Sequence, residues 1–164
     1  MRSFLNSFAF AVFLGLPCLA FAQGTDVALG GLALDAALPV EVTADSLSVD
    51  QDTGHATFAG DVVVAQGDMR LSAGSLVVEY DTEQEAGISR MTATGGVTLV
   101  NGPDTAAAQE AVYELGVSSL VMTGGVTLTQ GRTRITGDRF AIDLTTGAGR
   151  MEGRVRTVFQ TQDN

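Results

Sequence analysis

Hydrophobic and polar residues alternate along most of the chain with a period of two. Val62 and Val64 share one parity while Asp61 takes the other, and Leu76 and Val78 repeat the pattern. This alternation is typical of a strand with one buried face, because successive side chains point to opposite faces. No long segment follows the helical period of 3.6. The pattern therefore predicts an all-β domain of antiparallel strands.

A repeated sequence word organises these strands. Gly95-Gly96-Val97 and Gly124-Gly125-Val126 begin two copies that lie 29 residues apart, and a third copy begins at Gly60. Each copy ends in Gln-Gly or Asn-Gly, which predicts a tight turn, and we interpret the Gly-Gly pairs as glycines at turns and at the starts of strands. An acidic insertion at 81–87 is expected to be a loop. A solenoid, a closed barrel and a rolled two-sheet jelly roll all fit this periodicity.

One set of side chains shares the inner face of the predicted strands. Such a face can fill its own interior or leave an apolar groove, and the pattern leaves both possibilities open. A groove would suit acyl chains, because each buried methylene contributes about 0.8 kcal/mol. The inner-face residues are Val62, Val64, Val97, Leu99, Tyr113, Leu115, Val126, Leu128, Phe140 and Ile142.

The N-terminus has the features of a cleaved export signal. Arg2 precedes the apolar stretch 8–16, and Ala20-Phe21-Ala22 is a small-x-small cleavage pattern. We therefore expect a signal peptide at 1–22, a flexible lead-in or short helix at 23–38, the β domain at 39–160 and a tail at 161–164. A retained membrane anchor is the alternative, although the apolar stretch is shorter than the roughly 20 residues of a spanning helix.

Composition excludes several classes of function. The 164 residues carry 19 acidic and 9 basic side chains, all nine of them arginine, and the net charge of −10 disfavours a nucleic-acid partner. One histidine, His55, and one cysteine, Cys18, leave little for catalysis or metal binding, so we expect no enzyme, no cofactor and no metal site. Six arginines lie after residue 114 and indicate either a solvated face that protects sheet edges or an anion-contacting patch.

Several segments resemble the OstA-like family of periplasmic lipopolysaccharide-transport proteins, to which LptA belongs. The resemblance covers about 39–160 and is carried by 39–50, 58–71 and 76–80, followed in the same order by 112–115, 120–124 and 154–158. It implies a periplasmic protein with a twisted, partly open β-jelly roll, built from repeats of about 29 residues. Lipid A acyl chains would lie in its apolar interior.

The resemblance also implies site residues and partners. Family lipid-contact positions fall on Val40, Val42, Tyr113 and Leu115, with Val97 as a looser match. Copies would stack end to end, the first strand (40–49) of one against the last (153–160) of another, and would join LptC-like inner-membrane and LptD-like outer-membrane partners. The expected edge contacts are Val42, Leu47, Val49, Val155, Val158 and Phe159.

The sequence leaves three other functions as alternatives. An LptC-like component anchored in the inner membrane would share the β repeats and keep its N-terminal helix. A ligand-free structural β protein would have a filled interior. An enzyme is ranked last.

Overall fold

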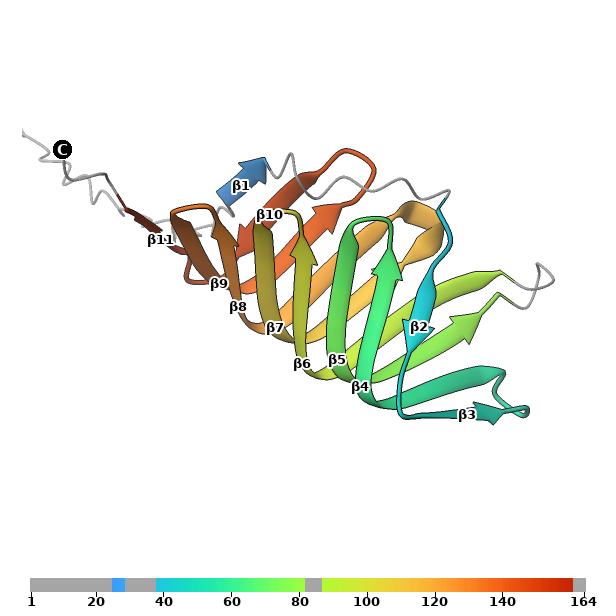
Figure 1. Ribbon diagram of the computed structural model, residues 1–164. Coiled ribbons are helices and arrows are strands. Elements are labelled where there is room, and N and C mark those ends of the chain that lie inside the picture. Colours follow the sequence, from blue (N-terminus) through green and yellow to red (C-terminus); the bar gives the residue numbers. More distant parts are fainter. Residues whose placement is uncertain (1–24, 29–37, 82–86, 161–164) are drawn as a thin grey trace, which may run out of the picture.

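The computed structural model describes residues 25–28, 38–81 and 87–160 (Figure 1). Its elements are strands and one short 3-10 helix, with no α-helix among the described residues. They are β1 (Thr25–Ala28), β2 (Glu41–Thr43), β3 (Ser46–Asp50), β4 (His55–Gln66), β5 (Met69–Tyr80), β6 (Ile88–Asn101), β7 (Asp104–Glu114), η1 (Leu115–Val117), β8 (Ser119–Gln130), β9 (Thr133–Asp143), β10 (Ala148–Glu152) and β11 (Arg156–Phe159).

The strands form one antiparallel sheet that bends into two layers and does not close. The order is β1-β10-β9-β8-β7-β6-β5-β4-β2, with β3 also on β4 and β11 also on β9. We call the layer with β2, β11 and the turns at 67–68, 102–103 and 131–132 the front layer. The back layer contains β1, β3, β10 and the other halves of β4 to β9 (Figure 1). This architecture confirms the predicted antiparallel, partly open jelly roll.

Each long strand passes from one layer to the other at a corner in its middle. In β6 the pairing with β7 shifts between Thr94 and Val97, where Gly95 and Gly96 have φ of +83° and +84°. Glycine adopts this left-handed conformation without steric cost. The Gly-Gly pairs therefore lie inside continuous strands, and our interpretation of them as turn or strand-start glycines is wrong. Alternation resumes on both sides of the corner, so local sequence resembles two separate strands.

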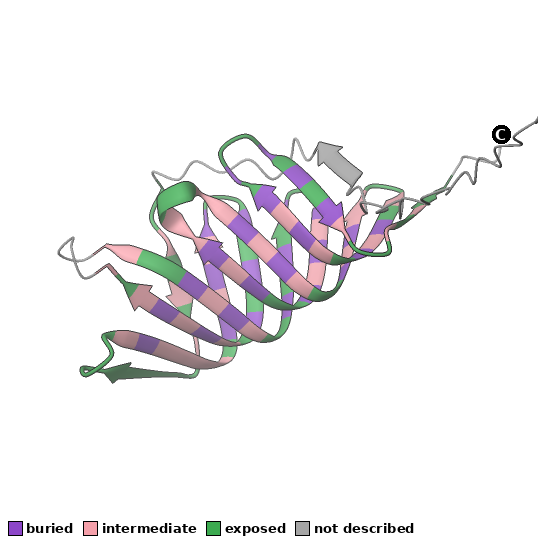
Figure 2. Cartoon of the chain, turned by 180° about the vertical axis from the view of Figure 1, so that it is seen from behind, coloured by how far each residue is buried: buried purple, intermediate pink, exposed green. Residues whose placement is uncertain are grey.

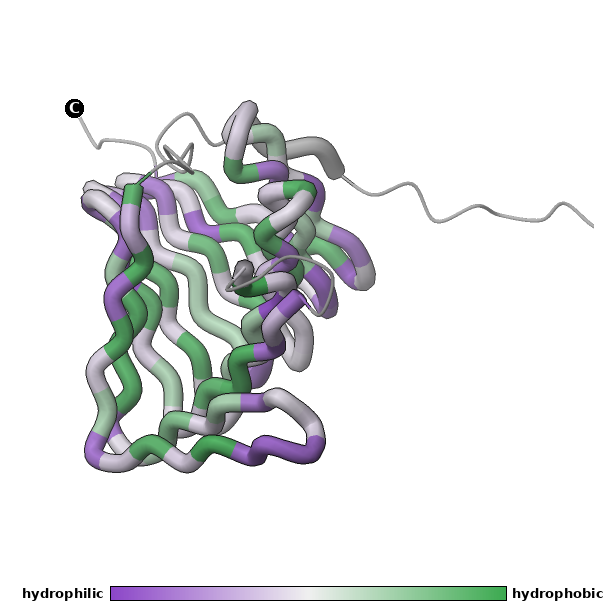
Figure 3. The backbone as a smooth tube through the Cα atoms, turned by 90° about the vertical axis from the view of Figure 1, so that its right-hand side faces the viewer, coloured by the Kyte–Doolittle hydropathy of each residue, from purple (hydrophilic) through white to green (hydrophobic). Residues whose placement is uncertain are grey.

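The hydrophobic core lies between the two layers. Buried and less buried positions alternate along every long strand, as the bands in Figure 2 show. The end-on view in Figure 3 shows the two layers meeting along the corner and diverging away from it. Apolar side chains from both layers fill the angle, and the largest fully buried one is Phe140.

The two ends of the sheet are built alike. At the N-terminal end, β2 pairs with the front half of β4 and β3 with its back half. The expected single strand at 40–49 is therefore two strands separated by a corner at Ala44-Asp45. At the other end, β10 pairs with the back half of β9 and β11 with its front half.

Part of the N-terminal lead-in differs from expectation. Thr25–Ala28 forms strand β1 on the outer edge of β10, where we expected a flexible segment or a short helix. The backbone groups along an unpaired sheet edge can accept such a strand whatever its side chains are. The expected signal peptide, the 161–164 tail and most of the 81–87 loop lie outside the described residues. At the base of that loop, the Asp81 N–H donates to the Gly87 carbonyl over 2.8 Å.

Candidate functional site

The interior between the layers contains the predicted inner-face residues. Nine of the twelve predicted interior residues belong to the buried core: Val62, Val64, Val97, Leu99, Tyr113, Val126, Leu128, Phe140 and Ile142. The other three, Val40, Val42 and Leu115, are partly buried and pack against that core. The structure thus brings the set together on one continuous apolar surface, and contact with a lipid stays a prediction.

A small cavity lies in this interior. Its volume is about 20 Å³, which is room for about one water molecule. The front layer contributes Val64, Met69 and Leu71, and the back layer contributes Leu76, Met91, Ala93, Ala111, Tyr113, Leu120 and Leu144. Burial raises the pKa of the Tyr113 phenol, so its hydroxyl is neutral at physiological pH. At this cavity the gap between the two layers is therefore narrow, and its lining is apolar.

A row of buried polar side chains borders the interior beside the front-layer turns. Gln66, Asn101 and Asp104 are each less than 7% exposed. The Gln66 side chain donates to the Leu38 carbonyl over 3.1 Å, and Gln130 donates to Asp104 over 3.2 Å. Among the described atoms, Gln66 Oε1 is buried without a hydrogen-bond partner. Our sequence analysis treated Gln66 and Asn101 as turn residues, although their recurrence at the same place in successive repeats was a signal that they share one environment.

Inward-facing apolar side chains are exposed at both ends of the sheet. At the N-terminal end, Leu47 is 56% and Val49 is 61% exposed, and both lie on the same face of the sheet as buried Ala56. At the C-terminal end, Phe159 is 71% exposed on the face shared with buried Ile135. Val158 is exposed on the outer face, and Val155 packs against the core. The apolar interior therefore continues to both ends of the molecule.

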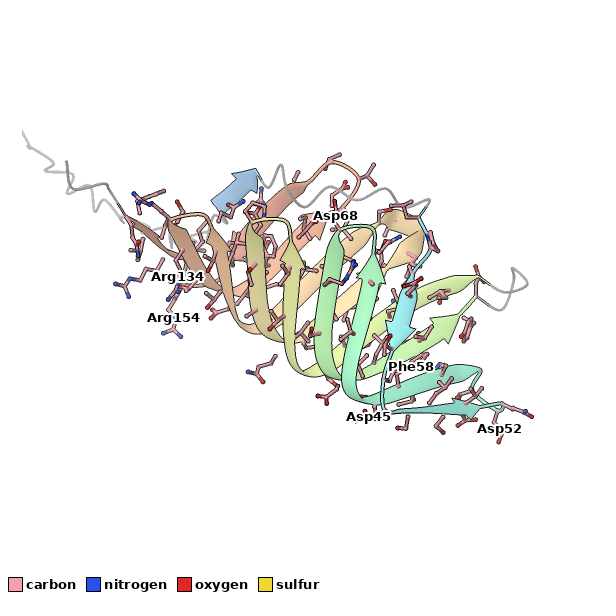
Figure 4. All side chains as sticks on the ribbon, viewed as in Figure 1. Asp45, Asp52, Phe58, Asp68, Arg134 and Arg154 are labelled. Atoms are coloured by element: carbon pink, nitrogen blue, oxygen red, sulfur yellow. The ribbon has the colours of Figure 1, made fainter. Side chains whose placement is uncertain are left out.

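The two ends carry opposite charge. Glu41, Asp45, Asp50 and Asp52 are exposed at the N-terminal end. The exposed arginines of the C-terminal end are Arg132, Arg134, Arg150, Arg154 and Arg156. Figure 4 shows Asp45 and Asp52 at one end of the stack and Arg134 and Arg154 at the other. Asp138 and Glu152 partly offset the arginines, and Glu152 accepts from Arg139 over 2.7 Å.

A further charged group lies on the outer face of the back layer. Arg90 donates to Glu114 over 2.8 Å and lies 3.8 Å from Glu79. The hydrogen bond from Arg90 to Glu114 raises the pKa of the guanidinium further above its already high value. No cluster of potential metal ligands occurs in the described part of the chain. Within those same residues, no helix is long and apolar enough to cross a membrane.

Comparison with known proteins identifies the family. Residues 41–148 match the family model of the LptA/(LptD N-terminal domain) LPS transport proteins. Among solved structures, the chain resembles LptH, described as the LptA-homologous periplasmic component of the lipopolysaccharide transport device of Pseudomonas aeruginosa. The TM-score is 0.68 at 21% identity, over 77% of this chain and 99% of LptH. No curated protein sequence matches the chain.

These findings agree with the architecture. The likeness to LptH shows the same jelly-roll fold. The matched family consists of transport proteins rather than enzymes, which confirms the prediction that the chain has no catalytic role. The chain belongs to the LptA/(LptD N-terminal domain) family of lipopolysaccharide-transport proteins.

Proposed function

We propose that the chain carries lipopolysaccharide through the periplasm, with the lipid A acyl chains held between the two layers. The observation that carries this proposal is the apolar interior that runs from Leu47 and Val49 at one end to Phe159 at the other. A ligand-free globular domain gains nothing from inward-facing apolar side chains left in water at both ends. A conduit that continues into its neighbours needs such ends.

Lipid entry requires the layers to separate. The cavity of about 20 Å³ is too small for an acyl chain. Within 38–81 and 87–160, the strands that pass from one layer to the other do so at the corner, so the side opposite the corner can open without breaking the strand ladders of either layer (Figure 3). Each methylene that then enters the interior contributes about 0.8 kcal/mol, which offsets the lost contact between the layers.

The flexible side chains of the lining fit this role. Met69 of the front layer and Met91 of the back layer both line the cavity. Methionine adapts to irregular apolar ligands because its side chain is unbranched. Tyr113 adds an aromatic ring whose hydroxyl stays neutral. No positive side chain lines the cavity, so binding there would depend on the acyl chains rather than on the phosphates.

The ends fit a head-to-tail assembly that spans the periplasm. An acidic end, where β2 and β3 have no further strand beside them among the described residues, faces away from an arginine-rich end where the same holds for β11. Opposite charges favour pairing of unlike ends and disfavour pairing of like ends. LptC-like and LptD-like jelly rolls at the two membranes would continue the same stack.

A ligand-free structural β protein is the second candidate, and the small volume of the cavity favours it. The two functions differ in one measurement. We would place a photocrosslinking amino acid at Val42, Tyr113 or Leu115 of the exported protein and irradiate it with purified lipopolysaccharide. Thr98 is the control, because it lies exposed on the outer face of β6.

Adducts at the inward positions but not at Thr98 are the expected result. Circular dichroism of each variant verifies that the fold is retained, and Val42 and Leu115, which are only partly buried, are less sensitive to the bulky probe than Tyr113. Folded variants that give no adduct at any inward position would mean that the interior stays closed to lipid. The structural role would then replace the transport role.

A further inference from the structure

Three of the four terminal strand edges are unpaired, and one is covered. In the described part of the chain, β2, β3 and β11 have no strand on their outer sides. The outer edge of β10 carries β1 in antiparallel register, with Thr25 opposite Met151 and Val27 opposite Gly149. The protein's own N-terminal strand thus covers the back-layer half of the C-terminal end.

The repeats predict how a second copy would continue the sheet. In β6 and β8, the residue just before the corner glycines pairs with the residue just after the corner of the next strand. Thr94 of β6 thus pairs with Glu110 of β7, and Thr123 of β8 pairs with Arg139 of β9. Gly153 is the corner of β10 and β11, and Asp45 is the corner of β2 and β3. Extending the rule by one strand places Glu152 opposite Ser46 of the second copy.

That register determines what β10 would contact. It places Met151 opposite Leu47, and Gly149 opposite Val49, of the incoming β3. The directions also agree, because strands alternate through the stack and β3 would run antiparallel to β10. In the same register, Val158 in the front layer would lie opposite Glu41 of the incoming β2. Both halves of the end would pair at once.

β1 occupies the positions that β3 of a second copy would take. Thr25 stands opposite Met151 where Leu47 would stand, and Val27 opposite Gly149 where Val49 would stand. We propose that β1 is an intramolecular cap that covers the back-layer docking edge on β10 and competes with the β3 edge of a second copy. This inference rests on the end-to-end assembly proposed above.

The competition between β1 and a second copy favours a copy that pairs with both layers. β1 supplies four residues to the back layer alone. A docking copy supplies the five residues of β3 and, through β2, a strand for β11 in the front layer. A partner that engages both layers therefore makes more ladder hydrogen bonds than the cap. A strand that reaches only β10 does not, so the cap rejects partial, misregistered pairing.

The test removes the cap without touching either docking edge. Asp26→Pro/Val27→Pro deletes two consecutive N–H groups of β1, one of which faces β10, since neighbouring residues in a strand donate to opposite sides. Asp26→Thr/Val27→Ile is the matched control, because it loses the same carboxylate and keeps both N–H groups. Sedimentation velocity over a concentration series measures the self-association of the exported proteins.

We expect the proline variant to self-associate with a dissociation constant at least about tenfold lower than that of the control. A reversible disulfide that holds β1 on β10 tests the opposite effect. Asp26→Cys/Arg150→Cys in the exported protein, which has no other cysteine after residue 22, joins β1 to β10 when oxidised, because these residues are directly opposite. The oxidised form should stay monomeric and associate again after reduction, with a thiol assay verifying both states.

Two adverse results have different meanings. Equal association constants for the proline variant and its control, with measurable association in both, would overturn the cap and leave the assembly intact. No association by either variant at any concentration would overturn the assembly and the cap together. Lipid crosslinking in the interior is measured independently, so lipid transport by single copies could still hold.

Discussion

At the scale of single residues, the position of a leucine relative to the two layers decides its contribution to stability. Leu128 is fully buried between the layers, whereas Leu47 is 56% exposed at the N-terminal end. Leu128→Ala should lower the free energy of unfolding by about 2–5 kcal/mol, because it removes buried methyl groups and leaves a cavity. Leu47→Ala should change it by less than about 0.5 kcal/mol. Urea denaturation of dilute protein measures both, and similar losses would mean that the interior is not the folding core.

The buried Tyr113 phenol makes the free energy of unfolding depend on pH. Burial raises its pKa in the folded state, so above a pH of about 10 the unfolded chain loses this proton before the folded chain does. The unfolded state then binds fewer protons, and the free energy of unfolding falls as pH rises. Tyr113→Phe should make the fall between about pH 9.5 and 11 shallower, as measured by thermal unfolding. An unchanged pH profile in Tyr113→Phe would show that this phenol does not control alkaline stability.

At the scale of elements, the corner through β6 holds the two layers together. A Cβ at Gly95 would lie 3.2 Å from Gly74 Cα on β5, whereas a Cβ at Gly96 would meet nothing within 4 Å. Both glycines have nearly the same positive φ, so replacing either with alanine costs about 1–2 kcal/mol of backbone strain. Their difference isolates the close approach of β5 and β6.

Gly95→Ala should therefore destabilise the protein more than Gly96→Ala. The additional loss comes from the few tenths of an ångström by which β5 and β6 must separate at the corner. Thermal unfolding of the two variants side by side gives the difference directly. Equal melting temperatures would show that the corner tolerates separation of the strands, contrary to the tight packing seen here.

Elements also show what local sequence could predict. Period-two alternation around Val97 and Leu99 gave the correct buried face, because a half-buried strand must alternate. The corner at Gly95 was missed because a strand that bends between layers has the same alternation as two strands joined by a glycine turn. The pairing of β1 with β10 was missed because an edge recognises backbone groups, which every residue except proline supplies.

The candidate site was predictable to the same depth. Alternation placed Tyr113 and Phe140 inside, and the repeats aligned them with the other interior positions. Burial of Gln66 depended on contact with Leu38, which lies 28 positions earlier in the chain. Such a contact follows from the way the first strand crosses the sheet, and no local pattern encodes it.

At the scale of the whole molecule, the distribution of charge matters more than its sum. The chain carries a net charge of −10, and uniformly charged copies would repel one another at every orientation. Added salt would then strengthen self-association by screening the repulsion. In this molecule the acidic residues of the N-terminal end and the arginines of the C-terminal end would meet in a head-to-tail contact (Figure 4). Salt should then weaken that contact.

The distance between the charges decides whether salt acts mainly on the repulsion between whole copies or on the attraction across the contact. At 0.1 M ionic strength the Debye length is about 10 Å, so charges on the bodies of two docked copies are largely screened while those across the contact are not. With the register inferred above, Arg156 would stand beside Glu41 of the next copy. A few such exposed pairs of about 0.5 kcal/mol each predict that the dissociation constant rises about tenfold between 0.1 and 1 M salt.

Charge-changing variants distinguish attraction across the contact from repulsion that depends on net charge. Arg156→Glu should raise the dissociation constant at 0.1 M salt and reduce its dependence on salt. Thr98→Glu/Val100→Glu changes the net charge equally and lies on the exposed outer face of β6, in the middle of the strand order, so its association should stay close to that of the unmodified protein. Sedimentation at several salt concentrations distinguishes the cases. If the two variants weaken association equally, or if salt strengthens it, overall repulsion governs the contact and the polarity of the ends does not direct the assembly.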